Sequence, residues 1–222
     1  NANRDQLSAL ETARYLIDNP TAAADWKKSV PGIITWVRQN LGAQPFFSSI
    51  PIHEQKFCHF VMGSHTARFA SLCARWYEVS GDVAFREMAV RSLNWASYMA
   101  CEDGTVTVGV DHPDYYNQCW FTDGYFDYVP HFITTMASIP SLAPNDTDHM
   151  LRSSSVIQKI TYLPYEISYV TFDAAGTQVL KLTFEPVQVL SGGESLRRGS
   201  TFEDQQGWFF DLDTHVLTVH HT

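Results

Sequence analysis

The chain has 222 residues, 45% of them hydrophobic and 18% charged, so it can bury a core and is not mainly disordered. Fifteen basic and 24 acidic side chains give a net charge of −9, which opposes binding to a phosphate backbone, so no nucleic acid partner is expected. No window is apolar over the roughly 18 to 20 residues of a transmembrane helix, and no membrane span is expected.

The first part of the chain is predicted to be helical. Apolar residues recur at helical spacing over residues 5–18, which predicts one helix, and again over residues 22–41. Pro31 interrupts the second stretch, and we expect it either to kink this helix or to start a new one. Gly42 is the expected end of the stretch.

Residues 63–100 are predicted to form a helical hairpin. Each half carries apolar residues on one side, and Ser80-Gly81-Asp82 between them has the pattern of a helix end followed by the N-cap of the next helix. A segment of mixed pattern follows over residues 101–128, and a short helix is expected over residues 129–139. Residues 140–148 are the expected linker.

Beyond Arg152 the hydrophobic pattern changes from helical to alternating. Leu180, Leu182 and Phe184 fall on one side of an extended chain, which predicts a half-buried strand whose opposite, polar side carries Lys181, Thr183 and Glu185. Strands are expected over residues 156–163, 165–172, 178–184, 187–190, 207–211 and 215–220, with turns at sites such as Gly192-Gly193. The histidines at the last strand are interpreted as surface residues: His215, His220 and His221.

These patterns predict an α+β fold with two domains. The first is helical and covers residues 1–148, and the second is a small antiparallel β-sandwich over residues 149–222. The expected core consists of the apolar residues on the periodic faces: Ile33, Val37, Phe69, Leu72, Trp76, Phe85, Leu93, Leu180, Leu182 and Phe184.

The segment before the expected linker combines acidic and aromatic side chains. Between Arg91 and Arg152 there is no Lys or Arg, whereas the acidic residues are Glu102, Asp103, Asp111, Asp114, Asp123, Asp127, Asp146 and Asp148. Sugar rings present C–H faces that lie on aromatic rings and hydroxyl groups that bond to carboxylates, and glycosidic cleavage commonly uses two carboxyl groups. The segment therefore suggests a carbohydrate site; the alternative is that the aromatic rings fill a core and the aspartates cap turns.

Four residues are the candidates for catalysis. Asp123 and Asp127 share one face if a helix begins within residues 120–131, and His53 and Glu54 would reach in from an earlier loop. One carboxylate beside another holds its proton to a higher pH, so an acid and a base can coexist in one site. The alternative is structural: Asp123 caps this helix, and Asp127 lies in its first turn beside the positive end of the helix dipole.

The candidates for substrate binding surround this acidic pair in the sequence. Trp120 and Tyr125 are the expected stacking platforms for a sugar ring. Arg68 lies one helical turn after His65, and it is expected either to pair with a carboxylate of the acidic segment or to form a structural ion pair. The full set is Trp120, Tyr125, Tyr115, Tyr116, His65, Arg68 and Asp111.

No metal or cofactor site is expected. His53-Glu54-Gln55 together with His59 and His65 matches no zinc signature, and the chain has no glycine-rich phosphate loop, nucleophile elbow or CxxC motif.

The four cysteines allow more than one pairing. A disulfide between Cys101 and Cys119 would tether the aromatic segment without distorting a helix. The alternatives are a Cys58–Cys73 pair or four reduced thiols. Cys73 falls on the apolar side of its helix, where a thiol is usually inert.

The predicted hairpin, with Gly63 to Arg68, Trp76 to Asp82 and Ala89 to Tyr98, resembles those of the (α/α) toroid, or six-hairpin, carbohydrate-active enzymes. Residues 120–131 resemble the aromatic, acidic approach to a following toroid helix, and a β-sandwich often follows the toroid in that superfamily. The resemblance implies a secreted or periplasmic carbohydrate-active protein, part of a polysaccharide-degrading glycoside hydrolase or lyase. The alternative is a non-catalytic glycan-binding module or a structural subunit of an extracellular assembly.

The number of expected helices limits this resemblance. Residues 1–150 supply roughly half of the helices that a closed toroid needs, so the chain is expected to be either part of a larger glycan-processing enzyme or a reduced helical domain. The partners implied are a polysaccharide or oligosaccharide, and either the remainder of a larger chain or a second copy of this one.

Overall fold

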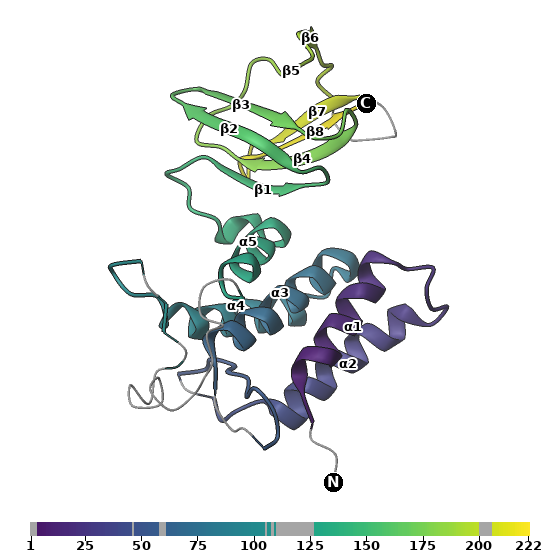
Figure 1. Ribbon diagram of the computed structural model, residues 1–222, viewed down its shortest axis with the longest axis vertical. Helices are drawn as coiled ribbons and strands as arrows, with labels where there is room; N and C mark the ends of the chain where they lie inside the picture. The colour runs from purple at the N-terminus through teal and green to yellow at the C-terminus, as the bar shows by residue number, and fades with distance from the viewer. Residues whose placement is uncertain are drawn as a thin grey trace. The chain divides into compact units, whose positions relative to one another are not determined.

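The computed structural model describes residues 4–45, 47–57, 61–104, 106–107, 109, 127–199 and 206–222. Within these ranges the fold is α+β, with five α-helices followed by antiparallel sheets (Figure 1). The chain divides into two compact units, Asn1–Ser138 and Ile139–Thr222, which we call the helical unit and the β unit. No helix in the described ranges is long and apolar enough to cross a membrane.

The helical unit is built from two pairs of helices and a fifth short one. Its helices are α1 (Gln6–Asp18), α2 (Trp26–Leu41), α3 (Gly63–Ser80), α4 (Val83–Ser97) and α5 (Val129–Ser138). The side chain of Asp5 caps α1 by accepting a hydrogen bond from the Leu7 amide. Helix α2 runs through Pro31 as one helix, so no new helix starts there.

The expected turn between α3 and α4 is confirmed. Gly81 ends α3 in the left-handed conformation (φ 72°), which a glycine adopts without a steric penalty. Asp82 begins α4 by accepting a hydrogen bond of 2.9 Å from the Ala84 amide. Two helix-terminal signals in adjacent residues therefore fix a tight connection, and α3 and α4 pack against each other as a hairpin.

Helix α3 is the centre of the helical unit, because it packs against each of the other four helices. All residues from 63 to 74 are consequently buried, including polar ones that a surface helix would turn to solvent. The expected core residues of this unit are buried except for Ile33, which is half-buried: Val37, Phe69, Leu72, Trp76, Phe85 and Leu93.

The β unit is centred on a four-stranded antiparallel sheet with the order β1-β4-β8-β7. Its strands are β1 (His149–Ser153), β2 (Ile157–Leu163), β3 (Glu166–Thr171), β4 (Gly176–Lys181), β5 (Leu190–Ser191), β6 (Glu194–Ser195), β7 (Gly207–Asp211) and β8 (Val216–His221). One face of the sheet carries buried apolar residues of β4, β7 and β8, and Ile167 and Tyr169 of the β2–β3 hairpin pack against them. The hairpin therefore covers part of this face.

Several expectations for the β unit are wrong in detail. Strand β1 was not expected, and only Leu190 of the strand predicted over residues 187–190 belongs to a strand, β5. Lys181 faces away from Leu180 as predicted but is buried, with its ammonium donating to the Thr214 carbonyl at 2.5 Å. Phe184 lies beyond the end of β4 and is half-buried.

The described cysteines do not form the expected disulfides. Cys101 is a free, exposed thiol, which contradicts its predicted bond to Cys119, a residue outside the described ranges. Cys73 is free and fully buried, and burial raises the pKa of its thiol above the usual range, as expected for an inert side chain. Cys58 also lies outside the described ranges.

Candidate functional site

An ionic cluster joins three parts of the helical unit at Arg68. One terminal nitrogen of this guanidinium donates to Glu11 of α1 at 2.9 Å, and the other donates to Asp127, which lies just before α5. Arg68 itself is buried on α3, with a side chain that is 9% exposed. The predicted pairing of Arg68 with a carboxylate of the acidic segment is confirmed, whereas sequence reasoning missed Glu11.

His131 extends this cluster from the first turns of α5. Its Nε2 lies 3.4 Å from the Asp127 carboxylate, and its Nδ1 lies 3.0 Å from the Ser71 hydroxyl of α3. Arg14 of α1 also donates to this hydroxyl, at 3.0 Å. Polar side chains of α1, α3 and α5 are thus connected through one network.

The charges of the cluster follow from its geometry. Burial alone would raise the pKa of Asp127, but hydrogen bonds from His131 and Arg68 outweigh it and hold this pKa well below its usual range. Burial lowers the pKa of His131, and the neighbouring guanidinium groups of Arg68 and Arg14 lower it further, against the opposing effect of Asp127. At neutral pH the carboxylate is therefore ionised and the imidazole is neutral.

The cluster contains a serine, a histidine and an aspartate in hydrogen-bond sequence, but it is not built for nucleophilic attack. Ser71 has no exposed surface, and its single hydroxyl hydrogen lies within reach of both His131 Nδ1 and the Arg68 carbonyl within α3. Asp127 holds no proton to give at neutral pH, so it cannot act as a general acid. The arrangement fixes Asp127 and the start of α5 to helices α1 and α3.

The other described candidates lie in the loop before α3 and in its first turns. His53 is half-buried, and its backbone forms an isolated antiparallel β-bridge with Val61. One carboxylate oxygen of Glu54 accepts a hydrogen bond of 3.0 Å from the Gln55 side chain. His65 is buried on α3, one turn before Arg68. The hydrogen bonds and ion pairs of Asp127 go to Arg68 and His131, so the described contacts do not join it to Glu54.

The remaining sequence candidates lie outside the described ranges: Asp111, Tyr115, Tyr116, Trp120, Asp123 and Tyr125. Residues that flank this segment are placed by the structure. Gly109 lies so close to Val61 that a Cβ at Gly109 would be 2.9 Å from the Val61 carbonyl, and Asp127 is bound to Arg68. Gly109 therefore lies beside the chain that leads into α3, and Asp127 is bound to α3 itself.

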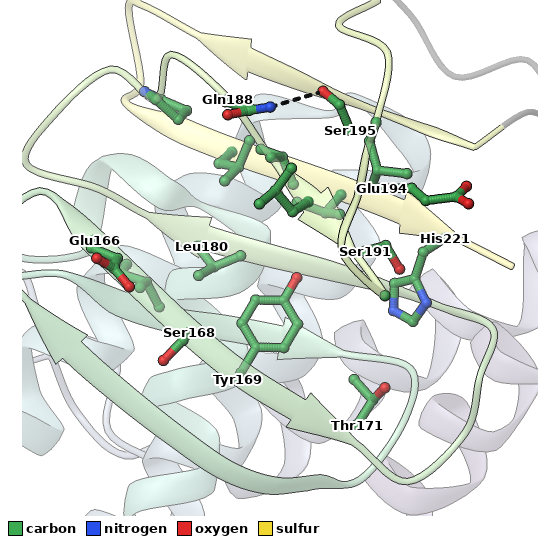
Figure 2. A pocket seen from close by; sticks show the side chains of 18 of the residues that line it. Glu166, Ser168, Tyr169, Thr171, Leu180, Gln188, Ser191, Glu194, Ser195 and His221 are labelled. Atoms are coloured by element: carbon green, nitrogen blue, oxygen red, sulfur yellow. Dashed lines mark hydrogen bonds between the residues drawn. The ribbon is translucent and has the colours of Figure 1, made fainter.

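The β unit contains a groove that the sequence did not predict. It lies between β3 and the segment over residues 184–196, has a volume of about 1320 Å³, and is floored by apolar residues of β4 and β8 such as Leu180 and Val219 (Figure 2). Its walls carry hydroxyl, amide and carboxylate groups, and one wall is ordered by a hydrogen bond of 3.3 Å from Gln188 to Ser195. The groove therefore offers an apolar floor and polar walls to an extended ligand.

Two aromatic rings line this groove beside the β2–β3 turn. Tyr165 is 82% exposed, and its ring meets that of Phe184 edge to face with 5.9 Å between ring centroids. Tyr165 also has a φ of 63°, a left-handed backbone conformation that is unfavourable for a residue with a Cβ. An exposed aromatic side chain in a strained position is the kind of feature that accompanies ligand binding.

A buried histidine lines the groove from the end of β8. His221 is 6% exposed, and its Nδ1 lies 2.6 Å from the Ala174 carbonyl. Because a carbonyl only accepts hydrogen bonds, Nδ1 carries a proton and donates it to Ala174. Within the described ranges Nε2 has no hydrogen-bond partner. The interpretation of His221 as a surface residue is therefore wrong, while His215 is exposed as expected.

One sequence signal would have pointed to the turn that carries Tyr165. Leu163-Pro164-Tyr165-Glu166 joins two strands and has proline at its second position, as type II turns commonly do. A type II turn requires a positive φ at its third position, which Tyr165 occupies. A tyrosine at a position that favours glycine is a visible anomaly. No comparable signal marks His221, because its burial depends on Gly176, the residue opposite it on β4, and on the Ala174 carbonyl.

Comparisons of the chain with protein-family models, with curated proteins and with solved structures found no significant match.

Proposed function

We propose that this chain is a carbohydrate-active protein that binds a polysaccharide or oligosaccharide in the groove of its β unit. In this proposal the helical unit is part of an (α/α) toroid, the β unit is a small antiparallel β-sandwich, and the two belong to a secreted or periplasmic protein that degrades polysaccharide. The observation that carries the proposal is the groove itself, with its aromatic rings and its polar walls.

The chemistry of the groove suits a sugar chain better than a compact polar ligand. The exposed ring of Tyr165 offers a flat face to the C–H surface of a sugar ring, and Phe184 supports it from the side. The hydroxyl, amide and carboxylate groups of the walls can accept and donate hydrogen bonds to sugar hydroxyls. Strand β3 runs along the groove for six residues, or about 17 Å, which gives an extended ligand room to lie.

The test is the binding of soluble glycans by the full chain. Affinity electrophoresis against a panel of neutral, amino and acidic polysaccharides is expected to show retardation of the wild-type protein by at least one of them. Tyr165→Ala is expected to lose most of this retardation because it removes the stacking ring. Tyr15→Ala, which truncates an exposed tyrosine of α1, is the matched control and is expected to behave as wild type. Absence of retardation on every glycan would refute the proposal.

A catalytic contribution from the helical unit is the second candidate function. The observation that favours it is the attachment of Asp127 to Arg68 and the close approach of Gly109 to Val61, because these residues flank the acidic and aromatic segment. That arrangement keeps the ends of the segment near α3 and near His53. Within this function Asp127 is a positioning residue, and Asp123 and Glu54 are the carboxyl groups left to act as acid and base or nucleophile.

Product analysis distinguishes this second function from binding alone. Cleavage by hydrolysis releases reducing ends, whereas cleavage by elimination leaves an unsaturated, ultraviolet-absorbing sugar. If the helical unit is catalytic, Asp123→Asn is expected to abolish the released product while the affinity of the β-unit groove stays at the wild-type value. A wild-type chain that binds a glycan and releases no product from it would make the protein a binding module.

A further inference from the structure

One edge of strand β3 borders the groove of the β unit. A pocket on one face of a strand is lined by alternate residues, because successive side chains point to opposite faces. Every residue of β3, from Glu166 to Thr171, lines this groove, whereas its described lining includes no residue of β2. The groove therefore runs along the backbone of β3, on the side away from β2 (Figure 2).

The backbone groups along this edge are open. Within the described ranges β2 is the one strand that pairs with β3. Leu163 and Glu166 close the two-residue turn as a hydrogen-bonded pair, and hydrogen-bonded pairs then alternate along the antiparallel ladder. Ser168 is consequently bonded to β2, whereas the N–H and C=O groups of Ile167 and Tyr169 point away from it. These outward groups bond to no other backbone group of the described residues.

The edges of the four-stranded sheet are covered, in contrast to the edge of β3. At β7 the Trp208 amide donates to the Arg197 carbonyl and the Gly199 amide donates to the Trp208 carbonyl, both at 2.9 Å. At β1 a bulge shifts the register, and the Met150 amide donates to the Tyr162 hydroxyl at 3.0 Å. Strand β3 has neither proline nor lysine, which often protect an exposed edge, and the bulge of its hairpin lies on β2. Its edge can therefore accept another strand.

The groove also has the surfaces that an added strand needs. A strand beside β3 would turn alternate side chains toward the apolar floor, next to Ile167 and Tyr169, and the others outward, next to Glu166. Glu194 lies on the opposite wall, and the described lining contains no Lys or Arg. The groove therefore suits an extended segment in which apolar residues alternate with basic ones.

We propose that the groove binds an extended, basic segment of another polypeptide chain, which adds to β3 as a strand. The backbone of this segment pairs with the open N–H and C=O groups of β3, and the floor and the carboxylates select its side chains. This inference goes beyond the proposed function, because it adds a protein partner. A strand in this position excludes a glycan from the groove and so controls access of the sugar, a consequence that rests on the proposed function.

The probe is a peptide of alternating valine and lysine with capped ends, six residues long to match β3. Titration of the full chain with this peptide, at low ionic strength and without glycan, is expected to show saturable binding. The N-methylated peptide keeps the side chains but has no amide donors, and it is expected to bind at least about tenfold more weakly. Glutamate in place of lysine should also weaken binding, because Glu166 and Glu194 repel the peptide.

Amide hydrogen exchange in the wild-type chain locates the bound peptide. Exchange at Ile167 and Tyr169 is expected to slow when the peptide binds, whereas exchange at Ser168, which is already bonded to β2, should change little. Ile167→Pro removes one outward donor and is expected to weaken peptide binding about tenfold. Ile160→Pro removes the outward donor of another half-buried isoleucine, at the far edge of β2, and as the control it should bind like the wild type.

Three results would overturn the proposal. The first is the absence of saturable binding, or equal binding of the N-methylated peptide. The second is unchanged exchange at Ile167 and Tyr169 in the saturated complex, which would place the peptide elsewhere. The third is slower exchange there in the free chain as its concentration rises, which would assign the edge to a second copy. Because no glycan is present, these results are independent of whether the groove binds a sugar.

Discussion

Arg68 and Asp127 form an ion pair across 59 residues of the chain, and this pair ties the start of α5 to the central helix α3. The same guanidinium also binds Glu11 of α1, so a single buried cation connects three helices. A buried charge of this kind needs its partners, because an uncompensated guanidinium in an apolar interior is strongly unfavourable.

Removing the carboxylate of Asp127 is therefore expected to destabilise the protein. Asp127→Asn leaves Arg68 with Glu11 as its carboxylate partner, and we expect a loss of about 2 kcal/mol in the free energy of unfolding. Urea denaturation measures this change. Glu87→Gln, which breaks an exposed pair with Arg91, is the control and should cost no more than about 0.5 kcal/mol. Equal effects of the two substitutions would contradict a structural role for the cluster.

The lowered pKa of His131 predicts how the stability of the fold changes with pH. Its pKa is lowered by burial in the folded state, so below about pH 6.5 the unfolded chain binds a proton more readily than the folded one. Stability is therefore expected to fall as the pH decreases from about 7 to about 5. His131→Gln should flatten this part of the profile, whereas His215→Asn, at an exposed position, should not. A wild-type profile that is flat over this range would count against the assignment.

The pH dependence of Asp127 has the same sign but lies at lower pH. Its folded-state pKa is depressed, so its contribution is present above the usual carboxyl pKa of about 4 and is lost as the pH falls below that value. In Asp127→Asn the loss of stability below about pH 4 should accordingly be smaller than in the wild type. A steeper loss in the variant would show that the carboxylate is not held ionised.

Two glycines of the helical unit are expected to respond to alanine in opposite directions. At Gly63 a Cβ would lie 2.4 Å from Cγ of the buried Met99, so Gly63→Ala should destabilise by about 1 to 3 kcal/mol through overpacking. At Gly32, in the middle of α2, a Cβ meets open space, and Gly32→Ala should stabilise by about 1 kcal/mol through helix propensity. Thermal denaturation of Gly63→Ala tests the packing of α3 against Met99, and thermal denaturation of Gly32→Ala tests the effect of helix propensity in α2.

Substitutions of Tyr165 should separate strain from binding. Its left-handed backbone favours glycine, so Tyr165→Gly is expected to be about 1 kcal/mol more stable than Tyr165→Ala, both having lost the contact with Phe184. Both variants should lose glycan affinity equally. If Tyr165→Gly retained the affinity of the wild type, the ring would not be a stacking platform.

Local signals account for the parts of this fold that were predicted correctly. Each of these local signals depends on the conformational preference of the residue itself, which can be read from the sequence. They are the helix end at Gly81, the cap at Asp82 and the two-residue turn at Gly192 and Gly193. The alternation around Leu180 similarly predicts which side of β4 is buried.

Long-range packing accounts for what was missed. Nothing in the sequence distinguishes Glu11 from the other acidic residues, because it reaches Arg68 only through the packing of α1 on α3. Lys181 and His221 are polar residues near strand ends, and each is buried because a backbone carbonyl far along the chain, that of Thr214 or Ala174, lies within hydrogen-bond distance. Such contacts follow from topology and register, which the alternating pattern alone does not determine.

The central claim, that the groove of the β unit binds a glycan, is tested most directly by mapping the site in solution. Backbone amide chemical shifts of the isotope-labelled full chain are followed during titration with the oligosaccharide that binds most tightly. We expect the changes to concentrate in β3, in residues 184–196 and at the end of β8 around His221. Saturable binding with shift changes confined to the helical unit would contradict the account.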